Sequence, residues 1–584
     1  MNARRLRILL MLLLALLPAL GCATLISHYG VNVPFWDEWE VGPALFEKMA
    51  AGQLTGSDLF KFHNEHRIVT YRLLILATAP FTHMNTKALM WISFAFAGLT
   101  ALGIYALARR SPLNYRWITL LFLLANLTLF SAVQHENWLW GMQTLFFIPT
   151  LCLVWALWLA LSPWPRWLVY PLAILLGLLA TFSSANGMLL WVIVALPLAW
   201  SASRRELAEK KSWLLAWTAT FLASTIFYFQ GYHSPPDHPP LSYALTHPLQ
   251  SVHYFLTYLG GSLGFGTLVP PTLWCAAIGA ALLAAYLFMT AYMVWQRRDY
   301  AFLKPLLAWW GLGLYALGCA GMTTLGRVGM GVEQGLSSRY TTFSQWLLIA
   351  LLFGLPLILL DARKKGFLLT RALGPALAIG LGAFLVTWTL TNAWAIERCA
   401  VTRNHRLAAR ARMLLLHLIP EEGVSNYLFY KVPLTAPYAR CLDQLGYMQP
   451  PLIRTRNITE LRGSDEQANQ LGLQGKIEQM VQVSPGHYLV TGWAAFTKLD
   501  RTVDTIMLTY ESPTTPPTLL GLADVALDHQ PVPAAQNAGR NIGWRRGSAY
   551  PASLPPGSWL LRAWAIDSST GKFYPLQGTV PFIR

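Results

Sequence analysis

Charged side chains are scarce in this chain. They make up only 12% of its 584 residues, whereas hydrophobic residues make up 54%. A soluble protein carries about 25% charged residues, so the composition excludes a soluble globular protein and indicates an integral membrane protein. The formal net charge of +17 is typical of positive cytoplasmic loops, and nucleic-acid binding is a poor explanation for it.

Ionisable residues are nearly absent from the apolar runs of spanning length. Channels and carriers usually place such residues at mid-membrane, so their scarcity argues against ion or proton translocation. A shorter run, 68–81, contains Arg72 and Pro80, and we expect it to lie on the membrane or to re-enter it. Eleven other runs predict an α-helical polytopic membrane domain over residues 1–396: 6–26, 86–108, 116–133, 142–161, 167–182, 186–200, 212–231, 271–295, 305–325, 341–360 and 371–394.

The distribution of Lys and Arg predicts which side each loop faces. With the N-terminus in the cytoplasm, the cytoplasmic segments hold eighteen Lys and Arg and the outer segments hold seven. This bias fits the positive-inside rule, and counting 68–81 as a full span would destroy it. Acidic and histidine residues lie mostly in the outer segments, so we expect any chemistry at the outer surface.

The first outer loop, residues 27–85, begins with an acid pair. Asp37 and Glu38 lie between Trp36 and Trp39, about ten residues beyond the first span. Carboxylates can accept protons or ligate metals, and indoles suit the headgroup region or a sugar face. These residues are therefore candidates for catalysis, and an ordinary solvated loop with interfacial tryptophans is the alternative.

The same loop also carries the segment FHNEHR, residues 62–67. Its polar side chains can ligate a divalent cation or bind a sugar, and a polar helix cap before Ile68 is the alternative. Two further outer loops carry candidates. Polar groups beside tryptophans in 134–143 suit a carbohydrate or an interfacial belt, and arginines in 326–340 suit a lipid-linked phosphate or an ordinary anionic lipid. The candidate substrate-binding residues are His63, Glu65, His66, Arg67, Gln134, Glu136, Asn137, Trp138, Arg327, Glu333 and Arg339.

Two extracytoplasmic regions are predicted to follow the membrane domain. Residues 397–475 read as a helical connector. Residues 476–584 contain about seven short strand-like segments separated by turn residues, which predicts a β-sandwich that can bind carbohydrate. In an oxidising compartment, Cys399 and Cys441 can form a disulfide. The long outer loop 232–270, rich in proline and histidine, is expected to be a mobile lid.

Together, these features resemble the GT-C superfamily of membrane glycosyltransferases. The resemblance rests on a first span, the pair Asp37-Glu38, membrane-hugging helices ending near Pro80, a second span from Thr86, many later spans and a closing β-rich domain. It covers nearly the whole chain in architecture, and the layout is similar to that of aminoarabinose, mannosyl and arabinofuranosyl transferases. The basic-aromatic motifs of the best-known branches are absent, which leaves the sugar open.

The resemblance implies a polyprenyl-phosphate-linked sugar donor and a glycan, lipid or protein acceptor at the outer face of a bacterial-type cytoplasmic (inner) membrane. Asp37 would act as the base, and Glu38 would position the acceptor. Arg327 and Arg339, together with His66 or Arg67, would hold the phosphate. No cofactor is certain, but a divalent metal cation can assist, with Asp37, Glu65 and His66 as candidate ligands.

Two other functions stay open at this point. One is a non-enzymatic transporter or export component for an envelope glycan, favoured by the number of spans. The other is an enzyme of the O-antigen ligase or polymerase type, which would rely on outer-loop arginine and histidine and would not need Asp37.

Overall fold

The described residues of this computed structural model form two compact units. Described are residues 3–201, 203–235, 238–266, 270–419, 428, 432–455, 457–484, 487–499, 501–527, 542–549 and 556–583. The first unit comprises Met1–Gly30, Thr55–Ala77 and Lys87–Cys399, and the second comprises Val31–Leu54, Thr78–Thr86 and Ala400–Arg584. The first outer loop is therefore divided, because its acid pair belongs to the second unit and its FHNEHR segment to the first.

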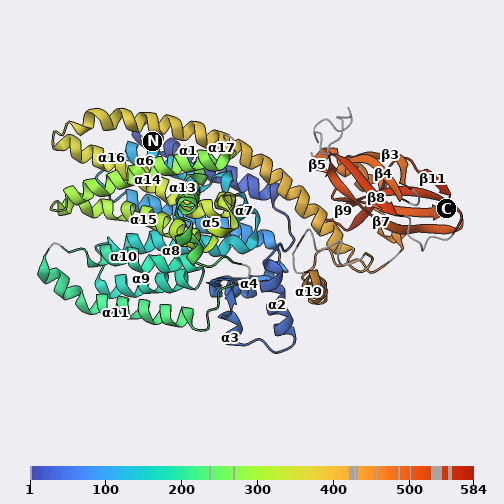
Figure 1. Ribbon diagram of the computed structural model, residues 1–584, viewed down its shortest axis with the longest axis horizontal. Coiled ribbons are helices and arrows are strands. Elements are labelled where there is room, and N and C mark those ends of the chain that lie inside the picture. Colours follow the sequence, from blue (N-terminus) through green and yellow to red (C-terminus); the bar gives the residue numbers. More distant parts are fainter. Residues whose placement is uncertain are drawn as a thin grey trace. The chain divides into compact units, whose positions relative to one another are not determined.

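Long apolar helices build the first unit, and their axes lie roughly along one common line (Figure 1). Each of the eleven predicted spans coincides with a helix. Among the described residues, eight helices are long and apolar enough to cross a membrane, and α1, α9 and α10 supply shorter apolar stretches. The helices are α1 (Ala3–Tyr29), α5 (Thr86–Ala108), α6 (Tyr115–Leu129), α8 (Thr144–Ala160), α9 (Arg166–Thr181), α10 (Leu189–Ala199), α11 (Arg204–Phe229), α14 (Pro271–Trp295), α15 (Tyr300–Arg327), α16 (Thr341–Lys364) and α17 (Leu369–Leu414).

The 232–270 segment is more ordered than the expected lid. It contains α12 (Ser242–Thr246) and α13 (Pro248–Gly264), and α13 is buried from Thr257 to Gly264. Glycines let α13 approach α14 closely. A Cβ added at Gly260 would lie 1.9 Å from the carbonyl oxygen of Cys275, and one added at Gly279 would lie 2.0 Å from that of Leu256. Small residues at such contacts allow helix backbones to pack tightly in membranes, so the lid prediction was wrong for this helix.

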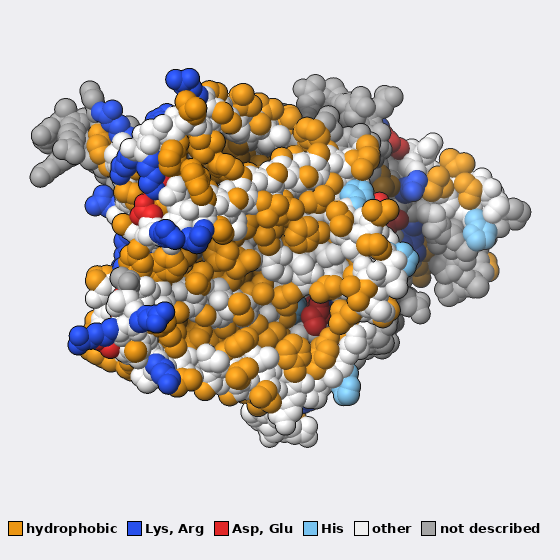
Figure 2. All heavy atoms as spheres, turned by 60° about the vertical axis from the view of Figure 1, so that its left-hand side comes forward, with side chains coloured by type: hydrophobic (Ala, Val, Ile, Leu, Met, Phe, Trp, Pro, Cys, Tyr) orange, Lys and Arg blue, Asp and Glu red, His pale blue; other side chains and the backbone are white. Residues whose placement is uncertain are grey.

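The two ends of the first unit differ in chemistry. Lys and Arg side chains gather at one end, beside a broad apolar band (Figure 2). Contacts at this basic end join the loops that the charge bias assigns to the cytoplasm, including an Arg166–Glu209 ion pair of 3.0 Å and a Lys365–Asp299 ion pair of 2.9 Å. The loops assigned to the outside meet one another at the opposite end, which we call the acidic-histidine end because Glu65, His66 and His238 lie there. The pairing of loops therefore agrees with the predicted alternation of spans.

The second unit contains short helices besides its sheet. α2 (Glu38–Ala50) packs against α19 (Val432–Gln444), and the Phe46 and Tyr447 rings meet edge to face at 5.1 Å. α20 (Asp465–Leu471) begins with a capping box at Ser464 and Gln467, which satisfies backbone N–H groups at its start.

An antiparallel sheet forms the rest of the second unit. Its order is β10-β9-β6-β7-β8-β4-β3, with β11 beside β9 and β5 beside β4. β7 pairs with both β6 and β8, so it joins two halves of the sheet. Side chains from both halves, among them Ile477, Phe496, Leu508 and Trp544, share one core, as expected for an all-β domain. The strands are β3 (Leu473–Ser484), β4 (His487–Phe496), β5 (Arg501–Thr502), β6 (Thr505–Ser512), β7 (Thr515–Leu527), β8 (Gly543–Ala549), β9 (Ser558–Asp567), β10 (Lys572–Pro575) and β11 (Val580–Ile583).

Candidate active site

The FHNEHR segment folds as a β-hairpin. Its strands are β1 (Phe62–His63) and β2 (His66–Arg67), and His63 lies directly opposite His66. Asn64 takes a φ of 51°, a left-handed conformation that Asn tolerates better than most residues. The hairpin therefore presents Glu65 at its turn and brings two histidines side by side, which a helix cap would not do.

Arg67 fastens the hairpin to the end of α11. Its Nε donates to the carbonyl oxygen of Tyr228 at 2.7 Å, and its two Nη atoms donate to the carbonyl oxygens of Phe60 and Gln230. The guanidinium also lies over the Phe62 ring at 4.1 Å. Arg67 is buried and donates to three backbone oxygens, which supports a scaffolding role for it.

Glu65, His238 and Arg327 meet at the acidic-histidine end of the first unit. Arg327 Nη2 forms an ion pair with Glu65 Oε1, and Arg327 Nη1 lies 2.6 Å from His238 Nδ1. Because a guanidinium can only donate, His238 must present an unprotonated ring nitrogen to it. Glu65 Oε2 is buried and has no hydrogen-bond partner within the described residues. His238 Nδ1 lies 3.6 Å from this oxygen.

His66 is held in one protonation state beside this cluster. The backbone N–H of Ala185, at the start of the 3-10 helix η3 (Ala185–Met188), donates to His66 Nδ1 at 3.2 Å. Burial lowers the pKa of His66; Glu65 opposes this effect, and Arg327, His63 and His238 add to it. The lowered pKa favours the neutral ring, and because Nδ1 accepts the N–H of Ala185, the ring proton is placed on Nε2.

The pKa of Glu65 is shifted in the direction that keeps it ionised. Burial by itself would raise this pKa, but His66, Arg327, a backbone hydrogen bond and His238 together outweigh burial and lower it. Glu65 thus stays a carboxylate in a partly buried site, where it accepts from Nη2 of Arg327.

The two outer loops 134–143 and 326–340 dock onto each other. Glu136 Oε2 accepts the backbone N–H of Arg339 at 2.8 Å, and Asn137 Nδ2 donates to the Arg339 carbonyl oxygen at 2.9 Å. Gln134 Oε1 accepts from the Thr342 hydroxyl at 2.6 Å. Because these side chains bond to the opposite loop, Gln134, Glu136 and Asn137 fix the loop structure.

Trp138 supports the junction of the two outer loops from the protein interior. Its indole is fully buried, and Nε1 donates to the Ser131 carbonyl oxygen at 3.0 Å. Glu333, on the 3-10 helix η5 (Val332–Leu336), is exposed. The Arg339 side chain is partly buried beside Tyr340, with its guanidinium carbon 5.7 Å from the ring centre. Of the charged candidates in these two loops, Glu333 is exposed, whereas Glu136, Arg327 and Arg339 are partly buried.

Asp37 and Glu38 occupy different environments in the second unit. Asp37 is the N-cap residue of α2 and is partly exposed, whereas the Glu38 side chain is 1% exposed. Glu38 Oε2 accepts the backbone N–H of Phe35 at 2.8 Å, which closes the turn before α2. Trp36, directly before Asp37, has a φ of 47° and a side chain that is 46% exposed. A left-handed conformation at a bulky residue is unfavourable and is often found at functional sites.

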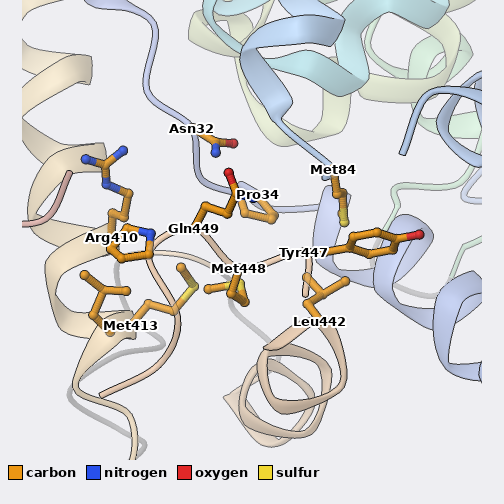
Figure 3. A pocket seen from close by; sticks show the side chains of 11 residues that line it. Asn32, Pro34, Met84, Arg410, Met413, Leu442, Tyr447, Met448 and Gln449 are labelled. Atoms are coloured by element: carbon orange, nitrogen blue, oxygen red, sulfur yellow. The ribbon is translucent and has the colours of Figure 1, made fainter. Parts of the chain in front are cut away.

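A small pocket in the second unit is lined in part by Asn32 and Pro34, which lie shortly before Asp37 (Figure 3). Met84 and Tyr447 line one side, and Arg410 and Met413 line the other. Arg410 Nε donates to the Ser568 hydroxyl at 2.9 Å. Burial lowers the pKa of Arg410, and Asp504 and Asp567 oppose that shift. The guanidinium of Arg410 is thus bonded to the β domain. Most of the other residues that line the pocket carry thioether, aliphatic or ring groups.

The expected metal site and disulfide stay predictions. Within the ranges that the structure describes, no group of three or more His, Cys, Asp or Glu side chains is arranged to hold a metal ion. Of the three candidate ligands, Glu65 and His66 lie in the first unit and Asp37 in the second. Cys399 and Cys441 are both unbridged here, and they too belong to different units.

Comparisons with known proteins add little. No family model matches the chain, and no curated protein matches it. Among solved structures, the chain is similar to the apo state of ArnT from Cupriavidus metallidurans, with 12% identity over 75% of this chain and 85% of that chain and a TM-score of 0.30. A TM-score this low carries no argument about substrate, mechanism or residues.

Three contributors to the site were not among the candidates from sequence. His238 lies in the loop 232–270, from which no candidate was chosen. Ala185 acts through its backbone N–H, and Tyr228 acts through its carbonyl oxygen and its hydroxyl. Backbone groups have no sequence signal. For His238, the signal was its place in an outer loop rich in histidine.

Proposed function

We propose that this protein is a membrane glycosyltransferase of the GT-C type. It would move a sugar from a polyprenyl-phosphate donor to a cell-envelope glycan, lipid or protein acceptor on the outer face of the cytoplasmic membrane. The observation that carries the proposal is the cluster of Arg327, Glu65, His238 and neutral His66 at the acidic-histidine end of the helices. A guanidinium at headgroup level is suited to the phosphate of a lipid-linked donor.

Arg327 is the group proposed to hold the donor phosphate. Its guanidinium is partly exposed and is paired with Glu65 and His238, so a phosphate oxygen would share or replace the Glu65 contact. The negative charge on the leaving phosphate grows as the bond to the sugar breaks, and a fixed cation stabilises that charge. Arg339 would add a second cation, and His66 Nε2 would donate a hydrogen bond to the phosphate or to the sugar.

Asp37 is the proposed base. It would take the proton from the acceptor hydroxyl, whose oxygen would form a bond to the anomeric carbon while the bond from that carbon to the phosphate oxygen breaks. The electron pair of that bond leaves with the lipid phosphate, and the configuration at the anomeric carbon inverts. Chain connectivity supports this assignment, because Asp37 and the hairpin of Glu65 lie in one loop between the ends of α1 and α5.

A substitution of Asp37 tests the proposal. Asp37→Asn keeps the size and most hydrogen-bonding capacity of the side chain but removes the base. We expect cells that carry it to accumulate the lipid-linked sugar, measured by mass spectrometry of extracted lipids, and to lack the sugar on the acceptor. Glu40→Gln, a partly exposed acid three residues along the chain, is the matched control and should stay active. Full activity of Asp37→Asn at normal expression would overturn the assignment of the base.

The arginine–histidine cluster also supports a second candidate, an enzyme of the O-antigen ligase or polymerase type. Such an enzyme would use Arg327, His66 and His238 and would not need Asp37. The same experiment separates the two, because loss of transfer in Arg327→Gln together with full transfer in Asp37→Asn favours the ligase type. Transfer that survives both substitutions favours a non-enzymatic export component instead.

A further inference from the structure

A polar cavity lies at the basic end of the first unit, away from the cluster of Glu65 and Arg327. Three connections that are far apart in sequence enclose it: the one between α8 and α9, the one between α10 and α11, and the start of α15. Basic, acidic and aromatic groups line it: Arg166, Lys210, Lys304, Glu206, Trp164, Tyr170, Trp200 and Tyr300. Its position does not depend on the second unit, because all of these residues belong to the first.

The cavity carries more positive than negative charge. Lys210 donates to the carbonyl oxygen of Trp200 at 2.6 Å and pairs with Glu206 at 3.1 Å. Arg166 pairs with Glu209 at 3.0 Å and keeps 37% of its side chain exposed. Lys304 is exposed and makes no ion pair with any described residue. Three cations therefore face a cavity that one carboxylate, Glu206, lines directly.

Aromatic rings frame the cavity. Trp200 and Tyr300 stack at 5.5 Å with an angle of 21° between their planes, and Trp164 meets Trp158 edge to face at 5.2 Å. The Tyr170 hydroxyl donates to the Leu198 carbonyl oxygen at 3.3 Å. Trp and Tyr concentrate at the level of lipid headgroups, so the cavity opens where a phosphate headgroup lies.

An apolar hollow adjoins the cavity at Trp200. It runs between α10 and the start of α11. Its apolar lining comes from Leu196, Ala199, Trp200 and Leu207, and Ser201, Ser203 and Arg204 complete it. The Leu196 and Leu207 side chains are 40% and 43% exposed. Trp200 lines both the polar basic cavity and the apolar hollow. The cavity suits the charged headgroup of an amphiphile, and the hollow suits its apolar chain.

We propose that this combined site binds an anionic glycerophospholipid of the adjacent leaflet. Its phosphate would contact Lys304, Arg166 and Lys210, and one acyl chain would follow the apolar hollow past Leu196 and Leu207. Basic pockets between membrane helices bind anionic headgroups in this manner. General surface charge does not explain the arrangement, because Arg297 and Arg298 lie at the same end but do not line the cavity.

Lipid retention by the full-length protein tests the proposal. The purified protein is exchanged into nanodiscs of phosphatidylcholine with one fifth phosphatidylglycerol, transferred to mild detergent, and examined by native mass spectrometry. The wild type should retain phosphatidylglycerol in clear excess over its share of the bilayer. Arg166→Gln/Lys304→Gln should lower that excess about tenfold, because each basic group near anionic lipid contributes substantially to binding.

A matched variant and a competitor give the outcomes that would overturn the proposal. Arg297→Gln/Arg298→Gln removes two cations from the same end and should leave retention unchanged; an equal loss there would mean general surface charge. Inorganic phosphate at millimolar concentration should not displace the lipid; displacement would mean a site for free phosphate. Lys304→Gln alone, at an exposed position, should lower retention severalfold and serves as the test if the double variant does not fold. Equal retention of both lipids by the wild type would also contradict the proposal.

Discussion

Arg67 donates a hydrogen bond from Nε to the backbone carbonyl oxygen of Tyr228, 161 residues further along the chain, at 2.7 Å. The Tyr228 hydroxyl returns the contact by donating to the Glu65 carbonyl oxygen at 3.0 Å and by accepting the Arg67 backbone N–H at 3.1 Å. The end of α11 and the hairpin thus hold each other in place. The position of the Glu65 carboxylate therefore depends on Tyr228, which contacts the backbone of the hairpin and not the carboxylate.

Arg67→Lys should destabilise the protein although it conserves the charge. Lysine cannot reproduce the planar fork that serves three carbonyl oxygens, and buried acceptors left without donors cost about 1–3 kcal/mol each. We expect a melting temperature several degrees lower in detergent. Lys61→Gln, at an exposed position in the same loop, should change it little. An unchanged melting temperature for Arg67→Lys would contradict the scaffolding role.

Arg327→Gln should reduce sugar transfer without a comparable loss of stability. Removing one group that stabilises developing charge usually lowers kcat by about 100- to 1,000-fold. Arg327→Lys should retain part of the activity, since it keeps a point charge but loses the bidentate geometry. The measurement is transfer in isolated membranes at matched protein levels. A variant Glu65→Gln tests the pairing separately, and full activity of Arg327→Gln would rule out its proposed contact with phosphate.

Asn137→Ala should loosen the junction of the two outer loops. The substitution removes the amide that donates to the Arg339 carbonyl oxygen and to the Thr342 hydroxyl from a fully buried position. We expect the free energy of unfolding to fall by about 1–3 kcal/mol. Protease sensitivity within 326–340 should rise, as measured by the rate of cleavage of protein in detergent. Glu333→Ala, in the same loop but exposed, should leave the cleavage rate unchanged. Direct recognition of sugar by Asn137 would instead lower activity with no change in cleavage.

His66 should make the protein sensitive to mild acid. Because the pKa of His66 is lowered from its usual 6.5, the unfolded chain binds the proton first as the pH falls. The stability contribution of the neutral ring is therefore complete above about pH 6.5 and is lost as the pH falls through the window below it. We expect the melting temperature to fall less between pH 7.5 and 5.5 in His66→Gln than in the wild type. His487→Gln, at an exposed strand position, should follow the wild type.

Sequence patterns predicted the architecture well because membrane helices and strands leave long, regular signals. The run 86–108 reproduces α5, and the alternating segments after residue 476 reproduce the strands. α13 was missed because its glycines and polar residues lower its hydropathy, although the spacing of Gly260 and Gly264 is typical of closely packed helices. The FHNEHR segment was not recognised as a hairpin, although Asn64 is a turn-forming residue.

The candidate site was harder to predict because sequence shows which side chains are present and not which of them are already engaged. Arg67 and Arg327 are both arginines of predicted outer loops. Arg67 donates to carbonyl oxygens, whereas the side chain of Arg327 is partly exposed. Asp37 and Glu38 are adjacent, yet only Glu38 is buried in a turn. Such differences arise from partners far along the chain, and no local pattern encodes them.

The pairing of Glu65 with Arg327 also has a consequence for biosynthesis. These residues are 262 positions apart, so a ribosome completes the hairpin long before it reaches α15. A nascent chain interrupted between the two would carry the early carboxylate without its cation. The ion pair can therefore form only late in membrane insertion, which makes the proposed donor site inactive in truncated products.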